Sequence, residues 1–174
     1  MKVFKVLLVG DGGVGKTTLL DAYRLRRFFE HKATIGLSIS VCDVDLGDRR
    51  KCKFVVYDFS GQPRFMRIAK HIPRLVKGAH GAILAFDLSS FMTLPVLVEW
   101  SSIIREVNGD IPTILVGTKA DLEPEVSEED IKDFMERLGA KAYVETSSRL
   151  MKNVDVPFRL LAKLIIEEYS SSSS

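Results

Sequence analysis

The chain has 174 residues, of which 46% are hydrophobic and 28% are charged, so it fits one globular domain with a sizeable core. A net charge of +2 does not favour a general nucleic-acid binder. Cys42 and Cys52 are too few for a disulfide framework or a zinc site, and no apolar run approaches the roughly 20 residues of a membrane span, so we expect a cytoplasmic protein.

An apolar strand is predicted over residues 3–9, followed by a glycine-rich turn and a helix over 16–27. The turn, Gly10-Asp11-Gly12-Gly13-Val14-Gly15-Lys16-Thr17, matches G-x-x-x-x-G-K-[ST] in the strand-to-helix context that this pattern requires. Glycines let backbone N–H groups point inward at phosphate oxygens, and the helix N-terminus adds positive partial charge. Lys16 would contact the β and γ phosphates, and Thr17 offers a hydroxyl ligand for Mg²⁺.

The next two strands, over 37–46 and 51–58, are joined by Gly47-Asp48-Arg49-Arg50, a hairpin signal that makes one strand antiparallel. A helix over 64–77 follows, with a kink expected at Pro73. Its cations are predicted on one side and its apolar residues opposite: Arg64, Arg67, Lys70, Arg74 and Lys77 against Phe65, Ile68, Ile72 and Leu75. This cationic side is either a solvated face or a docking surface for an acidic effector or regulator.

Apolar strands over 81–87 and 111–117 flank a helix over 91–107. Thr118-Lys119-Ala120-Asp121 follows the second of these strands. A carboxylate at Asp121 can accept from N1–H and N2–H₂ of guanine, whereas adenine presents an acceptor at N1 that would repel it. Four residues alone are more often a solvated turn, so guanine recognition is predicted because they lie after a strand and downstream of a phosphate loop.

The last third of the chain contains a helix over 127–138, a strand over 142–145 and a helix over 155–169. Ser127 with Asp130 resembles a capping box, and Gly139 is a plausible helix stop. Glu145-Thr146-Ser147-Ser148 could bring backbone N–H groups to guanine O6, or could be a polar loop before the last helix. The serine run 170–174 is expected to be a disordered end, which leaves one domain over 1–169.

Strand–helix alternation predicts an α/β fold of three layers: a six-stranded, mostly parallel sheet with one antiparallel strand, covered on both faces by about five helices. Ligands of such sheets bind beyond the carboxyl ends of the strands, where both motifs lie.

Together, the motifs resemble those of Ras-superfamily small GTPases, most closely the Rab branch, over residues 2–169. The resemblance also rests on Ala33-Thr34-Ile35-Gly36 and Asp58-Phe59-Ser60-Gly61-Gln62, with Arg64-Phe65, Gly78-Ala79-His80-Gly81 and Trp100 as Rab-like features. It implies a P-loop fold that binds GTP and GDP with Mg²⁺ and hydrolyses GTP slowly, as a molecular switch for effector proteins.

The resemblance also implies residue roles. Thr34 would coordinate Mg²⁺ only when the γ-phosphate is present, and Asp58 would hold the metal through water. Gly61 would donate its N–H to the γ-phosphate, and Gln62 would orient the attacking water. The implied catalytic residues are Lys16, Gly61 and Gln62, the metal site is Thr17, Thr34 and Asp58, and the nucleotide site is Gly12, Gly13, Val14, Gly15, Lys16, Thr17, Thr18, Phe28, Thr34, Gly61, Thr118, Lys119, Asp121, Ser147 and Ser148. Phe28 or Phe29 would cover the guanine, unless these rings pack in the core.

Four departures from the family pattern are visible. The spacing from Lys16 to Thr34 is one residue short and lacks the usual aromatic, which predicts faster nucleotide exchange. Thr118 replaces the commoner asparagine, which weakens a loop brace. Pro63 replaces an acidic residue and restricts Gln62, which changes hydrolysis in a direction that the sequence leaves open. The segment from Arg64 to Gly78 is about three residues longer than in Rab proteins.

Two other functions are compatible with a phosphate loop: a GTP-dependent interaction module with negligible hydrolysis, and a phosphotransferase acting on a small acceptor. Gly12, Gly61 and Gln62 favour hydrolysis over the first, and the second would need an arginine-bearing lid that no insertion offers. The expected partners of a monomeric GTPase are an activating protein, an exchange factor and effectors, without nucleic acid. Peripheral membrane association would require a lipidated tail that this sequence does not include.

Overall fold

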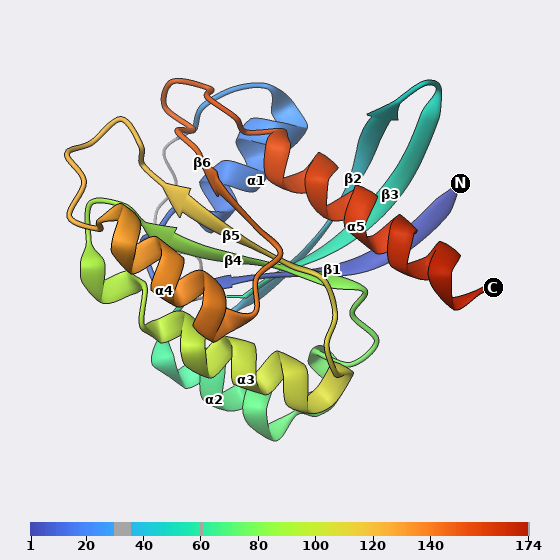
Figure 1. Ribbon diagram of the computed structural model, residues 1–174, viewed down its shortest axis with the longest axis horizontal. Helices are drawn as coiled ribbons and strands as arrows, with labels where there is room; N and C mark the ends of the chain where they lie inside the picture. The colour runs from blue at the N-terminus through green and yellow to red at the C-terminus, as the bar shows by residue number, and fades with distance from the viewer. Residues whose placement is uncertain (30–35, 60, 174) are drawn as a thin grey trace.

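The computed structural model describes residues 1–29, 36–59 and 61–173, and in this part of the chain strands alternate with helices (Figure 1). The strands are β1 (Lys2–Gly10), β2 (Leu37–Gly47), β3 (Arg50–Phe59), β4 (Gly81–Asp87), β5 (Thr113–Thr118) and β6 (Ala142–Glu145). The helices are α1 (Lys16–Leu25), α2 (Pro63–His71), α3 (Val96–Asn108), α4 (Glu128–Leu138) and α5 (Val156–Ser172), with 3₁₀ turns η1 (Pro73–Leu75) and η2 (Phe91–Thr93).

The strands form one sheet in the order β2-β3-β1-β4-β5-β6. β2 and β3 pair antiparallel, as the hairpin signal predicts, and the other neighbouring pairs are parallel. This sheet confirms the predicted α/β fold class. Because β1, β3, β4, β5 and β6 all run the same way, their carboxyl ends lie at one edge of the sheet.

Helices cover both faces of the sheet, α1 and α5 on one face and α2, α3 and α4 on the other (Figure 1). Alternate residues of β1 enter the two resulting cores: Val6 packs in the same cluster as Phe158 of α5, and Leu7 in the same cluster as Trp100 of α3. Each such fully buried side chain stabilises the fold by about 1.5–3 kcal/mol. The loops at the carboxyl edge are therefore attached to a rigid three-layer base.

Two helix signals read from the sequence are confirmed at α4. The Ser127 hydroxyl accepts from the Asp130 N–H at 3.1 Å, and the Asp130 carboxylate accepts from the Ser127 N–H at 3.0 Å, which is the predicted capping box. Gly139 ends the helix in the left-handed region at φ 63°.

The helix predicted over 64–77 is instead two elements, because α2 ends at His71 and η1 begins at Pro73. A proline lacks the N–H needed to continue an α-helix and clashes with the preceding turn. The apolar stripe predicted from Phe65 to Leu75 is also wrong. The core side of α2 is formed by Met66 and Ala69, one residue after Phe65 and Ile68 in each case, and Ile68 is exposed, whereas Leu75 of η1 does pack against the core.

The final helix is longer than predicted. α5 continues to Ser172, where a disordered serine end was expected from residue 170. The serine hydroxyls donate to carbonyls one turn earlier, for example Ser170 Oγ to Ile166 O at 2.9 Å, so they are satisfied within the helix.

Candidate nucleotide site

The phosphate loop runs from Asp11 to Gly15, between the end of β1 and the start of α1 at Lys16. Gly13 and Gly15 have φ of 76° and 94°, in the left-handed region that glycine adopts without strain. A Cβ built at either residue would meet nothing within 4 Å, so both face open space. Such a glycine-rich turn before a helix fits the cradle of backbone N–H groups that the sequence predicts for a phosphate chain.

Lys16 is the first residue of α1, directly after this loop, and is only 6% exposed. Its ammonium donates to Gly10 O at 3.0 Å and to Asp11 O at 2.8 Å. Burial lowers the pKa of Lys16 to about 8, and the negative charges of Asp58 and Asp11 partly oppose that shift. A phosphate group beside Lys16 would favour its charged form again, so the residue fits an anionic ligand.

Thr17 and Asp58 meet although α1 and β3 are separate elements. The Thr17 hydroxyl donates to Oδ2 of Asp58 at 2.5 Å, and Asp58 is 1% exposed. Asp58 pairs in register with Leu8 of β1, which brings the carboxylate to the strand that ends in the phosphate loop. A buried carboxylate beside a hydroxyl is a set of hard oxygen donors that fits Mg²⁺. Thr34, the third predicted metal ligand, lies outside the described residues.

The segment after β3 touches the phosphate loop directly. A Cβ built at Gly61 would lie 2.0 Å from Gly12 N and 2.1 Å from Asp11 C, so only glycine fits this contact. Gln62 is the N-cap of α2, with the extended backbone (φ −67°, ψ 137°) that the sequence predicts before a proline. Pro63 occupies the first helical position, where a missing N–H costs nothing.

The predicted base loop is tied to the phosphate loop. Lys119, at φ 58°, donates from Nζ to Gly13 O at 2.8 Å and forms an ion pair with Asp87 at 2.9 Å. The Thr118 hydroxyl is 2.6 Å from Val14 O. The two loops are therefore bound to one another across the carboxyl edge, and the brace expected to be weak at Thr118 is present.

Asp121 and the loop after β6 come together on the same side. Oδ1 of Asp121 accepts from the Ser147 hydroxyl at 2.7 Å. The N–H of Ala120 donates to Thr146 O at 3.0 Å, and the N–H groups of Thr146 and Ser147 donate to Gly117 O and Lys152 O. The loop after β6 is thus hydrogen-bonded to the predicted base loop, and Ser148 is half-buried next to Ser147.

Three further residues predicted to contact the nucleotide lie in α1 or shortly after it: Thr18, Phe28 and Phe29. Thr18 is half-buried in the first turn of α1, next to Thr17. Phe28 and Phe29 are 37% and 41% exposed, so neither is a core residue and the core alternative for them is wrong. Whether one of them covers a base stays a prediction.

Sequence reasoning missed Asp87, the last residue of β4. Besides pairing with Lys119, its Oδ1 accepts from the N–H of Ser89 at 2.8 Å and from its hydroxyl at 2.6 Å. The available signal was a carboxylate at the end of an entirely apolar strand, which marks the ligand edge of a parallel sheet.

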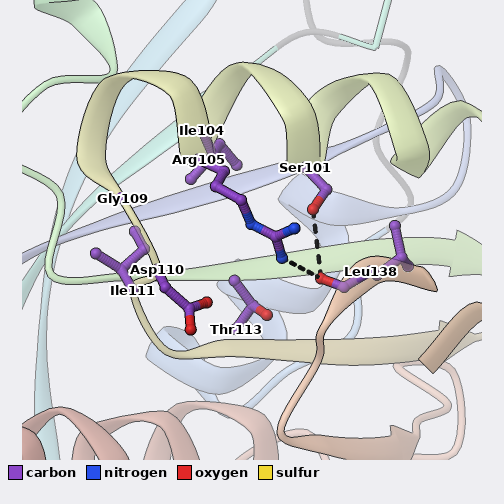
Figure 2. A pocket seen from close by; sticks show the side chains of 8 residues that line it. All are labelled: Ser101, Ile104, Arg105, Gly109, Asp110, Ile111, Thr113 and Leu138. Atoms are coloured by element: carbon purple, nitrogen blue, oxygen red, sulfur yellow. Dashed lines mark hydrogen bonds between the residues drawn. The ribbon is translucent and has the colours of Figure 1, made fainter. Parts of the chain in front are cut away.

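A small hollow near the opposite edge of the sheet is unrelated to this site (Figure 2). It lies beside Thr113, the first residue of β5, where the Ser101 hydroxyl and the Arg105 guanidinium both point at Leu138 O, at 3.4 and 3.3 Å. These bonds satisfy the carbonyl at the end of α4, so the hollow has a structural explanation.

Comparisons with known proteins agree with this geometry. A family model described as Ras family matches residues 5–167. The chain belongs to the Ras family.

Among its relatives, this Ras-family chain is 34% identical to Ras-related protein Rab-19 of Homo sapiens over 97% of its own length and 77% of that protein. It is 33% identical to Ras-related protein SEC4 of Saccharomyces cerevisiae, over 98% of this chain and 78% of the relative. For Ras-related protein Rab-25 of Homo sapiens the identity is 35%, over 97% and 78%. The predicted Rab-like resemblance is confirmed, and the chain is a small GTPase. Among the helices that the structure describes, none is both long and apolar enough to cross a bilayer.

Proposed function

We propose that this small GTPase binds GTP and GDP with Mg²⁺, hydrolyses GTP to GDP and phosphate, and acts as a switch for effector proteins, in membrane traffic as its Rab-like sequence suggests. The observation that carries the proposal is the bond from Lys119 Nζ to Gly13 O. This bond joins the predicted base loop to the phosphate loop, which supports the binding of one nucleotide across both loops.

The phosphate end is supported by charge and hydrogen-bond donors. Lys16 would bind the β and γ phosphates together with the N–H groups of residues 12–18, and the N-terminus of α1 would add its partial positive charge. Thr17 and Asp58 would hold Mg²⁺, joined by Thr34 when the γ-phosphate is present. Bound there, the ion would neutralise charge that develops on the phosphate oxygens.

Hydrolysis would depend on Gly61 and Gln62. Gly61 lies against Gly12 of the phosphate loop, which supports the predicted contact of its N–H with a γ-phosphate. Gln62 would orient the attacking water, since phosphoryl transfer needs positioning and charge neutralisation more than covalent chemistry. Loss of the γ-phosphate would remove these contacts and release the segments that carry Thr34 and Gly61.

Guanine selectivity would come from Asp121. Its Oδ1 is oriented by Ser147, so the carboxylate is held in place to accept from N1–H and N2–H₂ of guanine. Each hydrogen bond to a charged group contributes about 1.5–3 kcal/mol, and adenine would face a repulsive acceptor instead. The N–H groups of Thr146 and Ser147 are bonded within the protein, whereas that of Ser148 has no hydrogen bond to the described residues, so it is the candidate donor to O6.

Calorimetry of nucleotide-free protein with Mg²⁺ tests the binding step, and flat heats with GDP contradict the proposal. As a matched test of base recognition, Asp121→Asn should weaken GDP binding and improve xanthosine diphosphate binding, because xanthine carries a carbonyl where guanine carries an amino group. Single turnover of labelled GTP then separates a GTPase from an interaction module with negligible hydrolysis. Transfer from labelled ATP to a small acceptor would instead support the phosphotransferase.

Partners are proposed from the same switch. A monomeric GTPase of this kind would be served by an exchange factor and by an activating protein that donates an arginine, for which Gly12 leaves room: a Cβ there would meet its nearest neighbour only at 3.9 Å. The protein would be cytoplasmic, and peripheral at membranes if the full-length protein carries a lipid anchor.

A further inference from the structure

The contacts of the Thr118 hydroxyl within the protein determine whether this group can also bond a ligand. It is the last residue of β5 and is 4% exposed. Its Oγ1 lies 2.6 Å from Val14 O and 3.0 Å from Phe86 O. Both partners are carbonyl oxygens, which only accept, so the hydroxyl must donate to them. A threonine hydroxyl has one hydrogen, and that hydrogen is used inside the protein.

The loops proposed to surround the base differ in the hydrogen-bond donors and acceptors that they can offer to guanine. Guanine has donors at N1 and N2 and acceptors at O6 and N7. Asp121 can satisfy the donors. On the acceptor side, the N–H groups of Ala120, Thr146 and Ser147 are bonded within the protein. Lys119 donates to Gly13 O and Asp87, which holds its ammonium against the phosphate loop and β4.

We propose that Thr118 is a positioning residue that braces the phosphate loop and gives the purine no hydrogen-bond donor, so that nucleotide affinity is indifferent to purine N7. This inference rests on the proposed guanine-nucleotide binding. Guanine selectivity is unaffected, because guanine and adenine both carry N7 and differ at the N1 edge that Asp121 would contact.

An asparagine at position 118 would behave differently. Its amide has two N–H donors, so one can bond Val14 O while the other remains for a ligand acceptor. Threonine at this position therefore gives up a base contact, because its single hydroxyl hydrogen is shared between two carbonyl oxygens of the protein. Nucleotide affinity would consequently depend on the phosphates, on the donor edge of the base and on O6, without a contribution from N7.

The first test compares GDP with 7-deaza-GDP, in which N7 is replaced by C–H, on the unmodified protein by calorimetry with Mg²⁺. We expect the two dissociation constants to agree within about twofold. If a buried donor were aimed at N7, the analogue would leave it unsatisfied and bind at least about fivefold more weakly, which would overturn the inference. Failure of both nucleotides to bind would instead contradict the proposed function.

Variants of Thr118 give the second test. Thr118→Asn should bind GDP about 2- to 10-fold more tightly than the unmodified protein and leave 7-deaza-GDP unchanged. Thr118→Val removes the hydroxyl at similar volume, so it should weaken GDP and 7-deaza-GDP by the same factor, and Thr118→Ser should restore both. Unequal losses in Thr118→Val would show that the hydroxyl contacts the base and would overturn the inference. The comparison of GDP with 7-deaza-GDP uses the unmodified protein, so it does not depend on whether Thr118→Asn folds.

Discussion

The hydroxyl of Thr17 lies 2.5 Å from Oδ2 of Asp58, across 41 residues of sequence. Thr17 is in the first turn of α1, and Asp58 is near the end of β3. The parallel pairing of β3 with β1 brings the two together, because Leu8 and Asp58 are in register two residues before β1 ends. Sheet register thus places the carboxylate beside the phosphate loop.

Removing the charge of Asp58 should weaken metal binding. For Asp58→Asn we expect the Mg²⁺ concentration needed to retain bound GDP to rise about 10- to 100-fold, since an amide lacks the negative charge that orients and attracts the ion. Release of fluorescent GDP at graded Mg²⁺ measures this. Asp48→Asn in the exposed β2–β3 hairpin is the matched control and should behave as the unmodified protein. An unchanged Mg²⁺ requirement in Asp58→Asn would rule out the proposed metal site.

A methyl group at position 61 should be far less tolerated than one at position 12. Gly61→Ala places a Cβ 2.0 Å from Gly12 N, so the phosphate loop must shift, at a cost of about 1–3 kcal/mol in the free energy of unfolding. In Gly12→Ala the nearest atom is 3.9 Å away, and stability should be nearly unchanged. Chemical denaturation of both variants tests the difference, and equal stabilities would contradict the contact.

Pro63 should support hydrolysis by holding Gln62 and the first turn of α2. A proline whose ring is compatible with the local backbone stabilises the folded segment by about 0.4–1 kcal/mol, because it reduces the conformational entropy of the unfolded segment. We therefore expect Pro63→Glu to lower the single-turnover rate of GTP hydrolysis about two- to fivefold. Pro95→Ala, at the N-cap of α3, is a control that should keep the rate. An unchanged or faster rate in Pro63→Glu would contradict this role.

The cations after β3 should select an acidic partner. No aspartate or glutamate occurs between residues 59 and 86, and within the described residues the exposed Arg67 and Lys70 form no ion pair. Arg67→Glu with Lys70→Glu should weaken effector binding about tenfold or more, because like charges then face each other, and should leave GDP affinity intact.

The matched control for that double variant is Lys132→Glu with Lys163→Glu, exposed on α4 and α5, which should bind effectors normally. Titration of a purified effector at two salt concentrations gives the readout, since a charge-driven contact weakens with salt. Intact binding by the Arg67 and Lys70 variant would identify this side of α2 as a solvated face.

The two buried cysteines should make stability fall at high pH. Burial raises the pKa of Cys42 to about 11 and also raises the pKa of Cys52. The unfolded chain releases these protons near pH 8.5–9, so the contribution is fully present below that range and is lost as the pH rises towards about 11. Denaturation midpoints at pH 8 and 10 test this, and Cys42→Ala should reduce the fall. At pH 8, a thiol reagent should label the native protein slowly and the unfolded protein at once.

Local chemistry accounts for the features that were predicted correctly. The glycine turn between β1 and α1, the capping box of α4 and the β2–β3 hairpin are each encoded in a few consecutive residues with a fixed backbone requirement, such as Gly13 and Gly15 at positive φ. The two apolar cores follow from strand alternation. Helix periodicity across Pro73 was less informative, because a proline resets the phase of a helix and the sequence does not state by how much.

The sequence by itself predicted the ligand class, because Lys16, Thr17 and Asp121 lie in motifs after strands whose chemistry is typical of nucleotide binding. Only the tertiary structure decided which loops hold one another. Lys119 reaches Gly13 O across 106 residues, and Thr118 donates its hydrogen to Val14 O across 104. The physical reason is that such bonds depend on strand order and register in the folded sheet, which bring distant carbonyls within about 3 Å, a distance that spacing along the chain does not encode.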